Sequence, residues 1–218
     1  MRFLYNKNAG DERLNIQNEG FLHLKARRIK LGDRQDIRNL NDGYNYIYEV
    51  VELGRKNAIL ELVFKNSVVE NPQNFEIAWA CVEASVIEKS LPSLNEMGVK
   101  TLHLVFCEYS QQDLRYDLAR FERILHASSE QCGRNSIMQI KIWKNLDEIL
   151  SFNPNLALID FGGQNLDNAP QNQLLLIGPE GGFSDNERAK VKEKFGLGFE
   201  NILRSNTAII AVTAKMLG

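Results

Sequence analysis

Short apolar runs separated by turn residues make up the first third of the chain. The two clearest are residues 44–51 and 58–64, and a glycine-containing turn at residues 41–43 precedes the first of them. Short strands at this spacing are typical of a small barrel. The stretch 70–74 is polar and contains a proline, and a different rhythm follows it. We therefore predict a small N-terminal β-barrel domain over residues 1–70.

From residue 75 onward, strand-like apolar runs alternate with helical patterns. The strand candidates are residues 75–81, 101–107, 137–143, 156–161 and 174–177. Runs dense in Leu, Ile and Val that are separated by helices are typical of a mostly parallel sheet covered on both faces. We therefore predict an α/β domain over residues 71–218.

The clearest helical pattern runs from about residue 111 to residue 131. Its apolar side chains share one face, at Leu114, Leu118, Phe121 and Leu125. Ser110 and Asp113 have a spacing that resembles a capping box, and Gly133 suits the C-terminal end of a helix. The pattern predicts one helix over residues 111–131.

The composition is that of a folded protein, with 218 residues of which 44% are hydrophobic and 25% charged. No apolar run approaches the ~20 residues of a membrane span, and the first residues lack the apolar stretch of a signal peptide. We therefore expect a cytoplasmic protein without a membrane partner. The three cysteines form no CxxC pair and the three histidines have no ligand spacing, so we expect no metal site.

Basic residues gather in the first part of the chain although the net charge of the whole is −2. Residues 21–38 hold six basic residues and only two acidic ones. The six are Lys25, Arg27, Arg28, Lys30, Arg34 and Arg38. Such a segment contacts phosphates in some proteins and is an ordinary solvated face in others. His23 in this segment either contributes to the same surface or fills a turn of the barrel.

The loop after the run 174–177 has the sequence Gly178-Pro179-Glu180-Gly181-Gly182-Phe183. Ser184 and Glu187 then have the spacing of a capping box that opens a helix. A strand, a glycine loop and a helix at the carboxyl edge of a parallel sheet form the usual ligand site of such folds. The loop lacks the Lys-Ser/Thr of a Walker motif, and GxGxxG occurs nowhere. By itself the loop is also compatible with a structural turn.

Arg204 directly precedes a stretch, residues 208–217, that is apolar nearly all round. As a helix this stretch must be buried on several sides, against the sheet or against a partner subunit. Arg204 is either paired with an acid to close a loop or available as a cation for an anionic substrate.

Taken in order, these motifs resemble a known family. The glycine loop up to Ser184, then Ile202-Leu203-Arg204 with Thr207-Ala208, and Glu130 to Asn135 upstream, are similar to the ribosomal RNA small subunit methyltransferase E family. This is a family of uridine N3 methyltransferases in the SPOUT superfamily. His23-Leu24 with the basic run that follows is similar to the family's barrel domain.

The resemblance implies a small N-terminal PUA-like β-barrel that binds RNA and a C-terminal α/β methyltransferase domain with a trefoil knot, one of the rare knotted folds. It also implies a homodimer, small-subunit ribosomal RNA as the partner, and S-adenosylmethionine as the cofactor. The cofactor-binding residues carried over are Ile159, Asp160, Phe161, Gly162, Ile177, Gly178, Pro179, Glu180, Gly181, Gly182, Ile202, Leu203, Arg204 and Ser205. The RNA-binding residues carried over are His23, Lys25, Arg27, Arg28 and Lys30.

Methylation at N3 requires the uridine to lose its N3 proton, which leaves a negative charge on the uracil. Arg204 is the candidate that stabilises this charge, and Glu180 is the candidate that accepts the proton.

Three positions in two segments differ from the family pattern. Where the family has Thr-Glu, this chain has Ser205-Asn206, so no role of that acidic side chain transfers. Where the family has Glu-Arg-Ser, this chain has Tyr109 in place of the arginine. The alternatives to the main prediction are a catalytically inactive ribosome-assembly protein that binds RNA, and a SPOUT methyltransferase that acts on transfer RNA.

Overall fold

The computed structural model describes residues 2–67, 74–111 and 113–218. The chain divides into two compact units. Unit 1 comprises residues 1–71 and 126–137, and unit 2 comprises residues 72–125 and 138–218. The domain boundary predicted between residues 70 and 71 lies outside the described residues.

Unit 1 contains one five-stranded sheet. Its strands are β1 (Leu4–Tyr5), β2 (Arg13–Gln17), β3 (Arg34–Arg38), β4 (Tyr44–Leu53) and β5 (Asn57–Ser67), in the order β1-β3-β4-β5-β2. The strands predicted at 44–51 and 58–64 are confirmed, and both extend further. Within the described part of the chain, the edge strands β1 and β2 are not hydrogen-bonded to each other, so the predicted small barrel is observed as a half-barrel.

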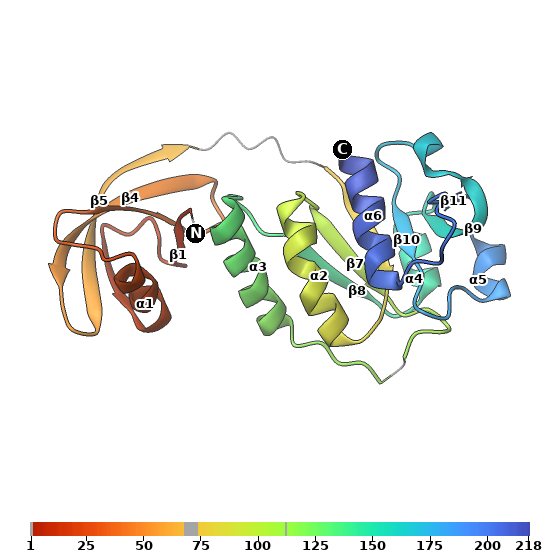
Figure 1. The fold of residues 1–218 in the computed structure, drawn as a ribbon, viewed down its shortest axis with the longest axis horizontal. Coiled ribbons are helices and arrows are strands. Elements are labelled where there is room, and N and C mark those ends of the chain that lie inside the picture. The colour runs from red at the N-terminus through yellow and green to blue at the C-terminus, as the bar shows by residue number, and fades with distance from the viewer. Residues whose placement is uncertain (1, 68–73, 112) are drawn as a thin grey trace. The chain divides into compact units, whose positions relative to one another are not determined.

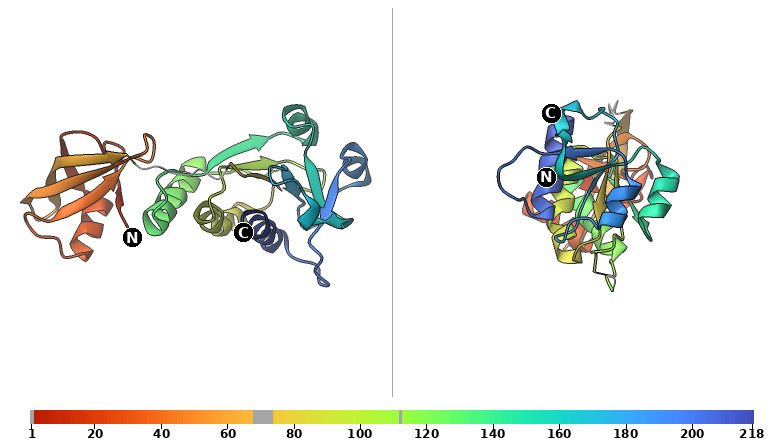
Figure 2. Two further views of the ribbon diagram at one scale, coloured as in Figure 1. Left: turned by 90° about the horizontal axis from the view of Figure 1, so that it is seen from above. Right: turned by 90° about the vertical axis from the view of Figure 1, so that its right-hand side faces the viewer.

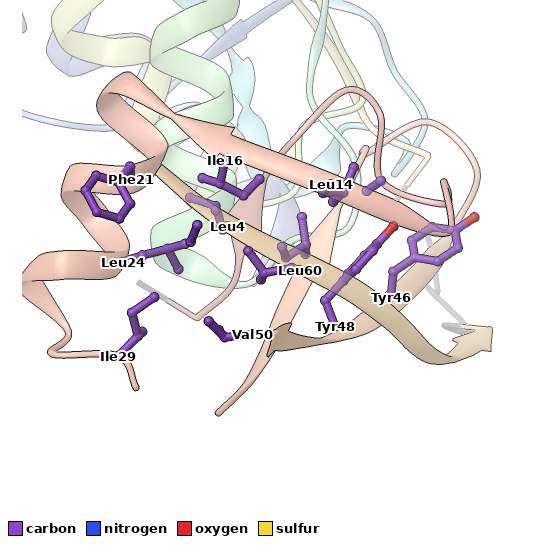
Figure 3. Close-up of a cluster of buried hydrophobic side chains, with 13 residues drawn as sticks. Leu4, Leu14, Ile16, Phe21, Leu24, Ile29, Tyr46, Tyr48, Val50 and Leu60 are labelled. Carbon is purple, nitrogen blue, oxygen red and sulfur yellow. The ribbon is translucent and has the colours of Figure 1, made fainter. Parts of the chain in front are cut away.

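The first unit also contains a helix that the strand pattern did not predict, α1 (Asn18–Ala26). Its two buried side chains, Phe21 and Leu24, are three residues apart and therefore share one face. Figure 3 shows them pointing into the same cluster as side chains from β2, β4 and β5. The basic segment 21–38 is therefore part helix, part turn and part strand.

The C-terminal end of α3 (Leu118–Cys132) belongs to unit 1 through specific contacts with β1. The Glu130 carboxylate accepts a hydrogen bond from the backbone N–H of Tyr5 at 2.6 Å, and the Glu130 carbonyl accepts one from Arg2 at 2.7 Å. The His126 ring stacks on Tyr5 with centroids 3.7 Å apart. Gly133 follows the helix with a φ of +92°, which confirms it as the predicted end.

Unit 2 is built on a parallel sheet of six strands. In spatial order these are β11 (Lys194–Gly196), β9 (Ala157–Asn165), β10 (Leu175–Ile177), β6 (Glu76–Ala80), β7 (Thr101–Val105) and β8 (Gln139–Trp143). The pairings in this sheet are all parallel. All five predicted strands are confirmed, and the three-residue β11 was missed.

Helices cover both faces of this sheet, as predicted. The other helices of unit 2 are α2 (Ala84–Glu96), α4 (Leu146–Phe152), α5 (Asp185–Lys190) and α6 (Ser205–Leu217), with a short 3-10 turn at Leu166–Asn168. In Figure 1 and Figure 2, α2 and α6 lie side by side on one face, and α4 and α5 lie on the other. The central strand β6 is consequently buried on both sides, from Ile77 to Ala80.

The helix predicted over residues 111–131 is shorter than its pattern indicated. It begins at Leu118, where the Asp117 carboxylate accepts a hydrogen bond from the Arg120 backbone N–H at 3.0 Å and so caps the first turn. The Ser110 hydroxyl does not cap a helix, because it accepts a hydrogen bond from the backbone of Cys107 at 3.1 Å. Leu118 is half exposed, so the apolar face is narrower than predicted.

Candidate active site

A cavity of about 650 Å³ lies where β10 ends and β9 continues beyond it. Its lining is drawn from three stretches, residues 159–165, 177–183 and 196–208. It includes the following residues predicted to bind the cofactor: Ile159, Asp160, Phe161, Gly162, Ile177, Gly178, Pro179, Glu180, Gly182, Ile202, Leu203, Arg204 and Ser205. Three stretches far apart in sequence thus meet at the carboxyl edge of the sheet, the usual position of a ligand site in such folds.

Gly181 is the one predicted residue outside this lining. A Cβ atom at Gly181 would lie 3.2 Å from Cβ of Tyr109, a side chain that is itself 57% exposed. The residue that departs from the family pattern therefore packs against the outer side of the glycine loop. Gly178 and Gly182, by contrast, face the cavity.

The loop is held by hydrogen bonds at both ends. The Gly182 N–H donates to the Pro179 carbonyl at 2.9 Å, which closes a tight turn, and Gly182 has a φ of +70°. Ser184 and Glu187 then form the capping box predicted for the start of α5, with Ser184 N–H to Glu187 Oε2 at 2.9 Å and Glu187 N–H to Ser184 Oγ at 3.1 Å. Glu187 is buried and serves this structural role.

The Ser205 hydroxyl connects the loop to the start of α6. It accepts a hydrogen bond from Nε1 of Trp79 at 2.7 Å and donates one to the Gly178 carbonyl at 2.6 Å. Trp79 is fully buried in β6. The side chain of Ser205 is therefore engaged within the protein, which leaves its backbone for a ligand.

A buried ion pair fixes the β9 side of the cavity. Asp160 accepts hydrogen bonds from Arg188 of α5 at 2.6 Å (Nε to Oδ2) and 3.3 Å (Nη2 to Oδ1), and the Asp160 side chain is only 7% exposed. These bonds raise the pKa of the Arg188 guanidinium. The pair holds α5 against the wall of the cavity that includes Ile159 and Phe161.

The two candidate catalytic residues, Arg204 and Glu180, both line the cavity and both are exposed. Arg204 stands immediately before α6, at its N-cap position. Among the residues that the structure describes, the Arg204 guanidinium has no salt-bridge partner, so the pairing with an acid considered from the sequence is not observed. A cation at this position is available to an anionic group in the cavity.

The third stretch of the lining, up to Asn201, was not predicted from the sequence. Its residues Gly196-Leu197-Gly198-Phe199 carry the chain from β11 around the cavity. Gly163 makes this path possible, because a Cβ atom there would lie 2.6 Å from the Phe195 carbonyl carbon. The signal in the sequence that could have revealed this path is the pair Gly162-Gly163, which follows the apolar run 156–161.

The residues predicted to bind RNA lie in unit 1 and divide into groups. Lys25 and Arg28 line a second, smaller cavity. His23 and Arg27 instead affect the pKa of the Glu130 carboxyl. Burial raises the pKa of this carboxyl, while the hydrogen bond from the Tyr5 N–H and the electrostatic influence of His23 and Arg27 act in the opposite direction.

Lys30 lies in the turn after α1, where its backbone N–H donates to Asp33 at 2.7 Å. Of the five predicted RNA-binding residues, Lys25 and Arg28 are thus the two that line a cavity.

Over the described residues, no group of three or more His, Cys, Asp or Glu side chains is arranged to hold a metal ion. Within the same ranges, no helix has both the length and the apolar character needed to cross a bilayer.

Comparison with known proteins identifies the class. The family model described as RNA methyltransferase domain matches residues 69–217, which makes this region an RNA methyltransferase domain. Two proteins named ribosomal RNA small subunit methyltransferase E, from Helicobacter pylori strains 26695 and J99, are 37% and 38% identical to this chain over 222 and 223 residues. In each case the match covers 98% of both chains. The chain belongs to the ribosomal RNA small subunit methyltransferase E family.

Solved structures agree with this fold. The crystal structure of a ribosomal RNA small subunit methyltransferase E from Neisseria gonorrhoeae, bound to S-adenosyl methionine, has a TM-score of 0.83. The match covers 99% of this chain and 96% of that one at 21% sequence identity. The two-unit architecture is thus retained at low sequence identity.

Proposed function

We propose that this protein transfers a methyl group from S-adenosylmethionine to N3 of a uridine in small-subunit ribosomal RNA. The observation that carries the proposal is the 650 Å³ cavity formed by the glycine loop, the end of β9 and the segment before α6. Membership of the methyltransferase E family supports the choice of cofactor and substrate.

The residues of the cavity suit S-adenosylmethionine. Its volume lies within the ~300–1,000 Å³ usual for cofactor pockets. Ile177, Pro179 and Leu203 supply apolar walls for the adenosine, and the glycines at 178 and 182 leave backbone groups accessible. The cofactor supplies an electrophilic methyl group when it is bound.

Arg204 and Glu180 are the residues of this chain proposed to act in the reaction. Glu180 accepts the N3 proton of the uridine, because it is an exposed carboxylate on the cavity wall. Arg204 stabilises the negative charge that then develops on the uracil, because its guanidinium lines the same cavity and has no salt-bridge partner in the described part of the chain. Orientation of the uridine supplies the rest of the rate enhancement.

We further propose the finer architecture implied by the family. The boundary between a PUA-like RNA-binding barrel and the methyltransferase domain lies near residue 70. A trefoil knot in the second domain is supported by the path of the chain, which returns from β10 through α5 to pair β11 with β9 before α6 packs beside α2. A homodimer is supported by α6, whose apolar Ile210 and Met216 remain partly exposed in the single chain. A cytoplasmic location is supported by the ribosomal RNA substrate in the names of the relatives.

The proposal is tested with the purified protein. Calorimetry is expected to show S-adenosylmethionine binding, and incubation with unmodified small-subunit ribosomal RNA is expected to yield N3-methyluridine in a nucleoside digest analysed by mass spectrometry. Arg204→Ala should lower the single-turnover rate at least tenfold while cofactor binding persists. RNA binding without methylation would instead favour an inactive assembly protein, and methylation of transfer RNA alone would favour the other alternative.

A further inference from the structure

The second cavity of the protein has about 370 Å³ and lies in unit 1, outside the methyltransferase domain. It is formed where the end of α1 meets the tight turn between β4 and β5. Phe21, Ile29 and Leu53 give it an apolar floor. The cavity thus joins two segments that are about 30 residues apart in the chain.

Three cations surround this apolar floor, and they come from both segments. Lys25 and Arg28 belong to α1 and the residues after it, and Arg55 stands in the β4–β5 turn. All three are exposed, and among the residues that the structure describes no acidic one lines the cavity. The charge of the site is therefore strongly positive.

These cations differ from other arginines of the same unit. Arg13 pairs with Glu52 at 2.5 Å, and the Arg38 guanidinium pairs with Asp36 at 2.6 Å. In the described part of the chain, Lys25, Arg28 and Arg55 have no such ion-pair partner. Their charge is available to a ligand from outside.

Two of these cations, Arg28 and Arg55, lie on backbone of defined conformation. Arg28 adopts a φ of +57°, in the left-handed region that side chains other than glycine rarely occupy. The turn that carries Arg55 is closed by a hydrogen bond of 2.9 Å from the Gly54 N–H to the Asn57 carbonyl, and a Cβ atom at Gly54 would collide with the Asn57 side chain. The backbone segments that carry Arg28 and Arg55 therefore have defined local conformations.

We propose that this cavity binds the backbone of an RNA strand, with a phosphodiester between the cations and the attached ribose on the apolar floor. Arginine suits a phosphate because it can donate two parallel hydrogen bonds. A site of this kind positions the RNA without reading its sequence. The inference rests on the proposed function for the identity of the ligand, and it adds Arg55, which the sequence analysis did not select.

The test compares single variants in RNA binding across a range of salt concentrations. The probe is unmodified small-subunit ribosomal RNA, and the variants are Arg28→Ala, Arg55→Ala and, as matched control, Lys56→Ala. Lys56 is the exposed neighbour of Arg55 in the same turn but does not line the cavity. Arg55→Ala changes an exposed turn residue, so it keeps the test valid even if Arg28→Ala disturbs folding.

Each cavity variant is expected to weaken RNA binding roughly tenfold and to lower the slope of log affinity against log salt by about one unit. Lys56→Ala should change neither quantity, and Arg55→Lys should retain most of the slope. Equal behaviour of Arg55→Ala and Lys56→Ala would overturn the inference.

Failure of this inference is distinguishable from failure of the proposed function. Cofactor affinity is measured on the same variants and is expected to stay at the wild-type value, because the cavity and the cofactor residues lie in different units. If the variants change the salt slope but the protein binds no S-adenosylmethionine, the inference about the RNA site holds and the proposed function is contradicted.

Discussion

Trp79 donates its indole N–H to the hydroxyl of Ser205 at 2.7 Å, in a fully buried position beneath the candidate active site. The same hydroxyl donates to the carbonyl of Gly178, so one side chain joins the central strand, the glycine loop and the last helix. Ser205 was selected from the sequence as a cofactor residue. Its side chain is better described as a support for the groups that contact the ligand.

Replacing Ser205 with Ala should destabilise the protein by about 1–3 kcal/mol, because the buried Trp79 N–H loses its partner. It should also weaken cofactor binding, since the Gly178 carbonyl is no longer held. Urea unfolding and calorimetry measure the two effects. Ser151→Ala, which removes an exposed serine, is the control and should change neither. A double-mutant cycle with Trp79→Phe should show coupling, and strict additivity would contradict the described bond.

Gly163→Ala should disrupt the pairing of β9 with β11 and abolish cofactor binding. The new Cβ atom would lie 2.6 Å from the Phe195 carbonyl carbon and 2.7 Å from the carbonyl carbon of Lys194, and backbone cannot move aside as a flexible side chain can. We expect a loss of about 3 kcal/mol or more in unfolding free energy. Gly162→Ala is the matched control, because its φ is +74° but no heavy atom lies within 4 Å of the new Cβ. Its expected loss is about 1–2 kcal/mol. Equal losses for the two variants would contradict this account.

Asp160→Asn should lower stability by about 1.5–3 kcal/mol, because the charged partner of the Arg188 hydrogen bonds is lost from a largely buried position. Cofactor affinity should fall with it, since Asp160 lines the cavity. The control is Asp185→Asn. Asp185 also faces Arg188, at 3.7 Å, but its side chain is fully exposed, so its loss should change stability by less than about 0.5 kcal/mol. Thermal unfolding of both variants measures the difference.

His103 makes the stability of unit 2 depend on pH. Its Nε2 lies 2.8 Å from Glu76 and its Nδ1 accepts a hydrogen bond from Trp143 at 3.0 Å. Burial lowers the pKa of this histidine below its ordinary value of 6.5, although Glu76 opposes the shift. The stabilisation from the neutral ring is therefore complete above pH 6.5 and is lost as the pH falls through the lower folded-state pKa.

We expect the free energy of unfolding to fall below pH 6.5 with a contribution of at most about 1.4 kcal/mol per pH unit from this group. His103→Gln cannot titrate, so the difference between the wild type and the variant should depend on pH in this range. Chemical unfolding at pH 5 to 8 measures it. A difference that stays constant across the range would show that His103 does not titrate with folding.

The parallel strands could be predicted because each is a dense apolar run, and the capping box of Ser184 and Glu187 is a local signal. The features that were missed depend on contacts between distant residues. The segment α1 has only Phe21 and Leu24 as an apolar face, too few to reveal a helix in an otherwise strand-like region. The start of α3 depends on which of several polar residues caps it, and Ser110 was already engaged with Cys107.

The segments that form the candidate site could be predicted from the sequence. The roles of the individual side chains could be predicted less well. Gly178, Gly182 and Arg204 line the cavity. The engagement of Ser205 with Trp79 joins residues 126 positions apart, and no local pattern contains it. The same holds for the division of the basic segment, in which Arg28 lines the smaller cavity and Arg27 does not.

The bond from Tyr5 to Glu130 spans 125 positions and has a consequence for synthesis. Unit 1 includes residues 126–137, so a ribosome that has made only the first 71 residues has not yet made the segment that pairs with β1. At ~5–20 residues per second, the wait for that segment lasts on the order of ten seconds. During this interval β1 lacks its partners on the later helix, and the N-terminal unit is completed only after more than half of the chain has emerged.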